Sequence, residues 1–122
     1  MTRFTPLALA LLALGSVSYA GQVAKHEVVV GTTYAYGAVS SARYSADNTQ
    51  SIRCGKENFN GSASVGFCMA VDRGADEIMC VTTDREQIRT IEGMTEFTDI
   101  YFQTYDGSCD FISMTHSSGY LP

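Results

Sequence analysis

The most regular pattern in the chain is an alternation of large apolar and small residues. Every second position of one stretch carries a large apolar side chain: Val65, Phe67, Met69 and Val71. The intervening positions are small: Gly66, Cys68 and Ala70. A period of two is typical of a β-strand, because successive side chains point to opposite faces. The pattern therefore predicts a strand over Ser64–Asp72.

Three turn signals place further strands around this one. Asn60-Gly61 is the strongest short hairpin signal, Arg73–Asp76 is a second turn, and Asp106-Gly107 is a third. The runs beside these turns are rich in residues that favour strands. The predicted strands cover 49–56, 64–72, 77–82, 98–105 and 109–115.

One short helix is predicted over Asp84–Glu92, where the period changes. Thr83 and Glu86 match a capping box, in which the hydroxyl caps the first turn and the glutamate reaches back. Ile88 and Ile91 lie about one turn apart and form a short apolar stripe. A helix this short is not stable alone, so we expect it to pack on the sheet.

The segment before these elements has a weaker pattern. Residues 21–37 are interpreted as an N-terminal arm or an edge strand, with a short run of strand character at Val28–Val30. Tyr34 and Tyr36 would share a face if the chain is extended there. Ala38–Tyr44 is weakly strand-like.

The first twenty residues have the features of a signal peptide. Arg3 precedes an apolar run over Leu7–Leu14, and Ser18-Tyr19-Ala20 supplies small residues at a cleavage site. The apolar run is shorter than the roughly 20 residues that a membrane span needs. We therefore expect cleavage after Ala20, a secreted or periplasmic protein, and no stable membrane span afterwards.

The predicted elements make one α+β domain over 38–122. We expect a small, mostly antiparallel sheet in the order β-β-β-α-β-β, with one short helix on it. With 122 residues and 45% hydrophobic content, the chain is not a wholly disordered one. Its net charge of −5 argues against a nucleic-acid partner.

The four cysteines predict two disulfides in an oxidising compartment. Cys54 and Cys68 are equally far from Gly61, and Cys68 and Cys80 are equally far from the second turn, so Cys68 can face either neighbour. The favoured pairing is Cys54–Cys68 with Cys80–Cys109, and a Cys68–Cys80 bond is the alternative. No Cys-x-x-Cys spacing points to a metal or redox site.

No residue is assigned to catalysis, a cofactor or a metal. The chain has no Gly-x-Ser-x-Gly elbow and no glycine-rich phosphate loop. His116, which lies near Ser113 and Ser117 in the sequence, is interpreted as a surface residue. The grouped carboxylates fall on hairpin tips, where solvent leaves their pKa values little reason to shift.

An excess of tyrosines supplies the candidate interaction face. Tyr101, Gln103 and Tyr105 lie on one face of the predicted strand 98–105, while Ile100 and Phe102 lie on the other. Tyrosine combines an apolar ring with a polar tip and therefore suits interfaces. The alternative is an ordinary half-exposed sheet face.

Several segments resemble a recurring pattern in small exported bacterial proteins with four cysteines. The segments are Ala42–Cys54, Gly66-Phe67-Cys68, Cys80–Asp84 and Asp106–Cys109. The resemblance covers about Ala38 to the C-terminus. It implies an exported domain and no activity, so no site residue is carried over from it.

These observations predict a small secreted, non-enzymatic interaction module that binds another protein or an envelope polymer. The alternative is an inhibitor of an extracellular hydrolase or protease, which would present Glu57–Ser62 or Arg73–Asp76 to its target. A third alternative is a small secreted hydrolase.

Overall fold

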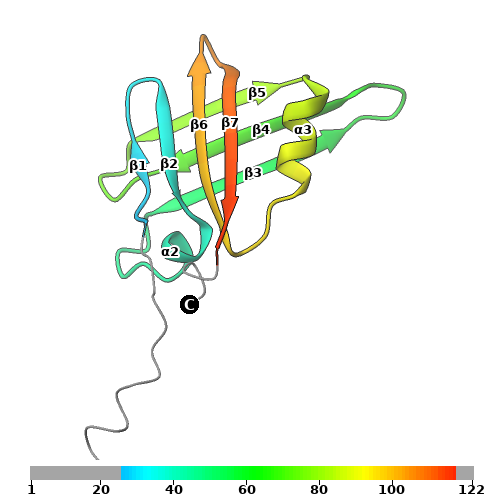
Figure 1. Cartoon of the computed structure of the whole chain (residues 1–122). Helices are drawn as coiled ribbons and strands as arrows, with labels where there is room; N and C mark the ends of the chain where they lie inside the picture. Colours follow the sequence, from blue (N-terminus) through cyan, green and yellow to red (C-terminus); the bar gives the residue numbers. More distant parts are fainter. Residues whose placement is uncertain (1–25, 118–122) are drawn as a thin grey trace, which may run out of the picture.

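The computed structural model describes residues 26–117. The predicted signal peptide over 1–20 lies outside the described residues. Within them, seven strands form one sheet, accompanied by two short helices (Figure 1). The elements are β1 (Val29–Val30), β2 (Tyr34–Ala38), α2 (Val39–Arg43), β3 (Ser51–Asn58), β4 (Ser64–Val71), β5 (Glu77–Thr82), α3 (Arg85–Glu92), β6 (Thr98–Tyr105) and β7 (Ser108–His116).

The sheet folds into two layers that face each other. Its strand order is β1-β2-β6-β7-β5-β4-β3. In Figure 1 the layer β1-β2-β6-β7 crosses in front of the layer β5-β4-β3. The layers join where β5 runs parallel to β7, with Val81 opposite Ser108 as the register pair. The other neighbouring strands are antiparallel, so the prediction of a mostly antiparallel sheet is confirmed.

The layer β5-β4-β3 has the register that its turns predict. Cys68 on β4 lies opposite Cys54 on β3 and opposite Cys80 on β5. The alternation along β4 buries Gly66, Cys68 and Ala70 on the inner surface, with Gly66 next to Ile88 and Ile91 of the later helix, and leaves the large apolar residues half-buried on the outer surface.

Two expectations for the region before β3 need revision. The described part of 21–37 forms β1 at the sheet edge and β2 between β1 and β6, so the sheet has two strands more than expected. Ala38–Tyr44 is not strand-like: Val39–Arg43 forms α2, which packs on β2, β3 and β6. Burial of Ser40 and Ala42 stabilises this short helix, and local propensity does not reveal such a contact.

The predicted helix is present, with a different cap. Its N-cap is Asp84, whose side chain accepts a hydrogen bond from the Gln87 backbone N–H at 3.0 Å, so the prediction of Thr83 as the cap is wrong. Aspartate and threonine are both good N-caps and stand next to each other here, so moving the start of the helix by one residue changes which of them is the cap. Ile88 and Ile91 are buried, and α3 packs on β3, β4 and β7.

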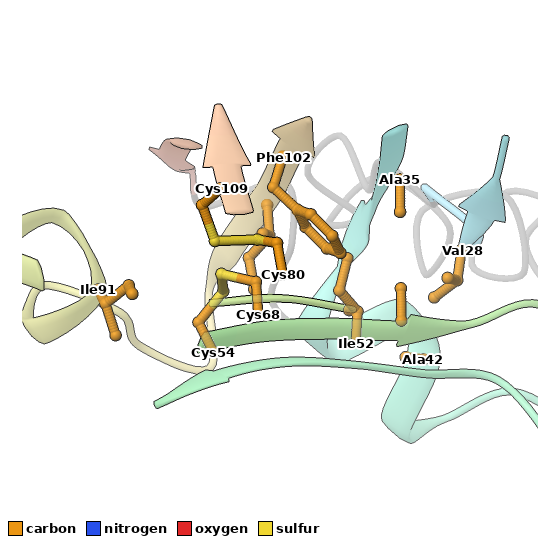
Figure 2. Close-up of a cluster of buried hydrophobic side chains, with 12 residues drawn as sticks. Val28, Ala35, Ala42, Ile52, Cys54, Cys68, Cys80, Ile91, Phe102 and Cys109 are labelled. Atoms are coloured by element: carbon orange, nitrogen blue, oxygen red, sulfur yellow. A yellow bond between two sulfur atoms is a disulfide. The ribbon is translucent and has the colours of Figure 1, made fainter. Parts of the chain in front are cut away.

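The core lies between the two layers and contains both disulfides (Figure 2). Cys54 pairs with Cys68, and Cys80 pairs with Cys109, which is the favoured pairing of the sequence analysis. The second bond connects the layers beside the point where β5 meets β7. Ile100 and Phe102 of β6 are fully buried and belong to the same apolar cluster as the four cysteines.

Candidate functional site

A group of aromatic side chains covers the outer surface of β2, β6 and β7. We call this surface the tyrosine face, and it consists of Tyr34, Tyr36, Tyr101, Gln103 and Phe111. On β2 and β6 these residues alternate with buried ones, such as Ala35 and Phe102. Sheet pairing brings the strands together: Tyr36 lies opposite Tyr101, and Gln103 lies opposite both Tyr34 and Phe111.

Three tyrosine rings on this face are nearly parallel and evenly spaced. The ring centroids of Tyr34 and Tyr36 are 6.3 Å apart, and each lies 6.4 Å from the centroid of Tyr101. The angles between the ring planes are 6°, 16° and 19°. Phe111 adds an edge contact to Tyr101 at 5.9 Å. Offset and edge contacts of this kind are favourable for aromatic pairs.

Local contacts hold these rings in place. The ring of Tyr34 lies over Gly31, where a side chain would clash with it. The Gly31 N–H donates to the Tyr34 carbonyl oxygen at 2.8 Å, which closes the β1–β2 turn. Gln103 Nε2 donates to the Tyr101 hydroxyl oxygen at 2.7 Å. The rings of Tyr34 and Tyr101 are therefore held by contacts within the chain.

The structure brings together two of the three residues proposed for the interaction face. Tyr101 and Gln103 lie side by side and share a hydrogen bond. Tyr105 lies past an irregularity in the β6–β7 register between Gln103 and Thr104, next to the hairpin turn, and is 79% exposed. Its ring is not among the described ring contacts of the tyrosine face.

A shallow, open depression lies at one end of the tyrosine face. It is lined by His26, Glu27, Val29, Tyr36, Asp99 and Tyr101. The imidazole Nδ1 of His26 lies 3.1 Å from Asp99 Oδ2. The side chains of His26 and Asp99 are 45% and 24% exposed, so this pair lies at the surface and is partly covered by the fold. Val29 is the β1 residue opposite Tyr36 and extends the apolar surface to the sheet edge.

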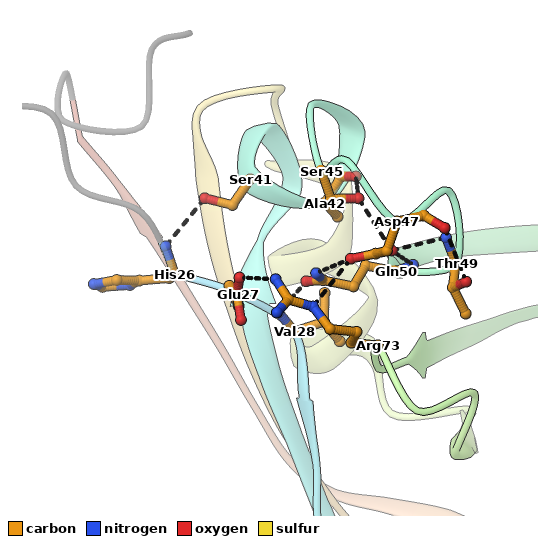
Figure 3. Close-up of polar contacts among 10 residues, drawn as sticks. All are labelled: His26, Glu27, Val28, Ser41, Ala42, Ser45, Asp47, Thr49, Gln50 and Arg73. Atoms are coloured by element: carbon orange, nitrogen blue, oxygen red, sulfur yellow. Dashed lines mark hydrogen bonds and ion pairs between the residues drawn. The ribbon is translucent and has the colours of Figure 1, made fainter.

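A polar network holds the N-terminal side of the depression (Figure 3). The His26 backbone N–H donates to Ser41 Oγ of α2 at 3.0 Å, and the Val28 N–H donates to Gln50 Oε1 at 2.9 Å. Glu27 forms an ion pair with Arg73, from the turn between β4 and β5. These contacts connect the segment before β1 to three other parts of the fold.

Asp47 is the centre of that network. Its carboxylate accepts hydrogen bonds from the Gln50 backbone N–H at 2.9 Å, the Gln50 side-chain amide at 2.6 Å and the Thr49 N–H at 2.8 Å. Arg73 adds a contact at 3.3 Å. These donors hold the pKa of Asp47 well below its usual range, with the Gln50 backbone contributing most. Asp47 therefore has a structural role: it fixes the loop that positions Gln50.

The described residues suggest no second chemical site. The imidazole Nδ1 of His116 lies 2.8 Å from the Thr98 hydroxyl, which is buried and also accepts from the Thr95 N–H. Across 26–117, no three metal-ligating side chains gather in one place. No helix in the same range has the length and apolar character needed to cross a membrane.

Sequence reasoning identified part of this surface. The shared face of Tyr34 and Tyr36 follows from their spacing, and the structure shows it. Their placement beside Tyr101 depends on the pairing of β2 with β6, which are distant in sequence and joined by no short turn. The pairing of His26 with Asp99 depends on the same long-range arrangement, and no local motif signals it.

The chain matches no protein-family model, and comparisons with curated proteins and with solved structures find no match. The resemblance to small exported bacterial proteins with four cysteines therefore stays a prediction. The candidate site rests on the geometry of the described residues.

Proposed function

We propose that this protein is a small secreted, non-enzymatic interaction module that binds a partner protein through its tyrosine face. The observation that supports this most directly is the set of three nearly parallel tyrosine rings on an outer sheet surface. Tyr34 and Tyr36 are 38% and 39% exposed although their rings are held in place. Exposed, ordered aromatic residues are enriched among those that dominate binding at protein interfaces.

Secretion is part of the same proposal. Two disulfides occur in this fold, and such bonds form and persist mainly in oxidising compartments. The leader predicted over 1–20 would deliver the chain to one.

The test compares partner capture by matched variants of the exported protein. One bait carries Tyr34→Ala with Phe111→Ala on the tyrosine face. The control carries Met79→Ala with Val81→Ala, which removes exposed apolar side chains from the opposite layer. We expect the control to retain a partner identified with the wild-type bait and the tyrosine-face variant to lose it, with both baits still folded. Retention by both baits, or loss only from the control, would contradict the proposal.

A second candidate function, inhibition of an extracellular protease, is favoured by one observation. Phe59 is 58% exposed at the tip of the β3–β4 hairpin, where the Ser62 N–H donates to the Phe59 carbonyl oxygen at 2.9 Å. The other proposed inhibitory loop is less suited, because Arg73 contacts Glu27 and Asp47. A protease panel assayed with wild type and Phe59→Ala tests this candidate. Inhibition lost on that substitution would favour it.

A further inference from the structure

We propose that Asn60 is a site of covalent modification: its side-chain amide is lost through attack by the Gly61 backbone nitrogen, which leaves aspartate or isoaspartate in the β3–β4 turn. Both residues are exposed in this turn. The inference goes beyond the proposed function and does not depend on the tyrosine face. Its evidence comes from the geometry of the turn, from the hydrogen bonds of the described residues and from a comparison with the other two asparagines of the chain.

The reaction needs only these two residues and water. The Gly61 nitrogen attacks Asn60 Cγ, so a bond forms between these atoms while the bond from Cγ to Nδ2 breaks. The proton of the Gly61 N–H leaves with the amide group as ammonia, and a succinimide ring remains. Water then adds to one of the two ring carbonyl carbons, the bond from that carbon to nitrogen breaks, and nitrogen regains a proton. Opening at one carbon gives aspartate; opening at the other gives isoaspartate, in which the main chain runs through Cγ.

The geometry of the turn leaves the attacking nitrogen uncrowded. The Ser62 N–H donates to the Phe59 carbonyl oxygen at 2.9 Å, which places Asn60 and Gly61 at the centre of a β-turn. Gly61 has a φ of +78° and Asn60 does not have a positive φ, which is the pattern of a type II turn. A Cβ atom at Gly61 would meet no atom within 4 Å beyond its chain neighbours. Glycine itself has no Cβ to shield its nitrogen.

No other part of the described chain holds either reacting group. Across 26–117, neither the Asn60 side chain nor the Gly61 N–H takes part in a hydrogen bond. Residues 59–63 are all exposed, and the β3–β4 ladder ends at the pair Asn58–Ser64. In Figure 1 this hairpin extends beyond the rest of the sheet. The tip can therefore rearrange into the succinimide at the cost of about one hydrogen bond, that between Ser62 and Phe59.

The other two asparagines have local contacts that oppose the same reaction. Asn48 precedes Thr49, whose N–H donates to Asp47 Oδ1 at 2.8 Å and whose β-branched side chain restricts access to the nitrogen. Asn58 lies in β3 opposite Ser64, and its Nδ2 donates to Ser64 Oγ at 2.9 Å. These two residues are internal controls, because all three asparagines are exposed to the same solution.

The product changes the surface of the hairpin tip. Loss of the amide adds a negative charge to a chain whose net charge is already −5. Isoaspartate also lengthens the main chain by a methylene group, and this group lies in the tip, outside the β3–β4 ladder. Phe59, the 58% exposed residue of the second candidate function, is the preceding residue. The modification therefore alters the loop that would carry protease inhibition.

The experiment incubates the folded, oxidised protein at mildly alkaline pH and follows each asparagine by peptide mass spectrometry. Digestion at acidic pH prevents further reaction during sample preparation, and an isoaspartyl methyltransferase, used as a reagent, detects isoaspartate. The same incubation of the reduced, denatured chain gives the rates without the fold. Asn60→Gln keeps a side-chain amide at this position, but its longer side chain disfavours closure of the ring. Asn58→Gln is the matched control, and ion-exchange chromatography follows the charge variants of both.

In the folded protein we expect Asn60 to react at least about tenfold faster than Asn48 and Asn58, and within about tenfold of its own rate in the denatured chain. Isoaspartate should be among the products, because the succinimide route forms it. Asn60→Gln should abolish the acidic charge variants that accumulate with time, whereas Asn58→Gln should leave them unchanged.

A smaller difference between Asn60 and the other two asparagines would overturn the inference, because the turn would then give no advantage. Slowing of Asn60 by more than about tenfold on folding would also overturn it, since the native turn would then protect the residue. Aspartate without isoaspartate would indicate direct hydrolysis by water instead of attack by the Gly61 nitrogen. None of these results would affect the proposed function of the tyrosine face.

Discussion

The ring of Tyr34 lies directly on the backbone of Gly31. A Cβ atom at Gly31 would stand 2.4 Å from Tyr34 Cε1 and 2.5 Å from Cζ, which is closer than any real contact. Glycine at this position therefore allows the Tyr34 ring to lie where it does, and the tyrosine face depends on a residue that has no side chain of its own.

Gly31→Ala should displace the Tyr34 ring without unfolding the protein. Because that ring is 38% exposed, it can rotate towards solvent, and we expect the free energy of unfolding to change by less than about 1 kcal/mol. Partner capture should fall. Gly74→Ala is the control, because a Cβ there meets only Asp72 Oδ1, at 3.4 Å. Thermal melting and capture by both variants test this, and unchanged capture by Gly31→Ala would show that the Tyr34 ring position does not matter.

The two disulfides should differ in their contribution to stability. Cys80–Cys109 spans 29 residues and Cys54–Cys68 spans 14, and each is expected to contribute about 3 kcal/mol or somewhat more, the longer loop adding about 0.6 kcal/mol. The longer bond also connects the two layers. Replacing Cys80 and Cys109 by alanine should therefore lower the melting temperature more than replacing Cys54 and Cys68.

Reduction of both bonds should lower the melting temperature by more than about 10 °C. In a domain of this size, each kcal/mol lost from the free energy of unfolding lowers the melting temperature by about 4 to 8 °C. Scanning calorimetry of the oxidised, reduced and two doubly substituted proteins measures these differences. A reduced protein that melts within about 2 °C of the oxidised form would show that the bonds contribute little.

Stability should depend on pH through Asp47. Hydrogen bonds to its charged form lower its pKa in the folded state, so its contribution is present above the ordinary aspartate pKa of about 3.9. The contribution is lost as the pH falls through the lower pKa of the folded state. Asp47→Asn should lower the melting temperature at neutral pH, and the difference from wild type should shrink in strong acid. Asp106→Asn removes an equal charge at an exposed turn, and an equal effect there would refute the argument.

Two aromatic residues of β6 should respond very differently to truncation. Phe102 is fully buried, so Phe102→Ala should reduce the free energy of unfolding by about 3 to 5 kcal/mol. Tyr105 is 79% exposed, and Tyr105→Ala should change it by less than about 0.5 kcal/mol. Urea denaturation of both variants gives the comparison. A large loss at Tyr105 would mean that its ring packs more closely than its exposure indicates.

The parts of the fold that sequence predicts are those determined by neighbours in the chain. Asn60-Gly61 and Asp106-Gly107 close their hairpins, with Gly61 and Gly107 at positive φ, and the alternation along β4 correctly predicts a strand there. The helix α2 has no such local signal. Its five residues include β-branched Val39 and two serines, and burial against the strands determines its conformation.

Only the part of the candidate site that lies within a single strand could be predicted from the sequence. The alternation along β6 separates Tyr101 from Phe102, and that distinction is visible in the sequence. The joining of Tyr36 to Tyr101, and of His26 to Asp99, requires β2 to pair with β6, and neither spacing nor turn chemistry specifies a pairing over that separation.

Because Cys68 stands opposite both Cys54 and Cys80, the geometry of the finished sheet alone does not decide which bond forms first. The order in which the cysteines reach an oxidising compartment can decide which bond forms first. A chain that enters an oxidising compartment N-terminus first exposes Cys54 and Cys68 together before Cys80 follows, whereas Cys109 arrives last. Early closure of the β3–β4 hairpin then protects Cys80 from the wrong partner and keeps its thiol for β7. A refolding chain whose four thiols are all present from the start has no such protection, and thiol–disulfide exchange must correct any Cys68–Cys80 bond.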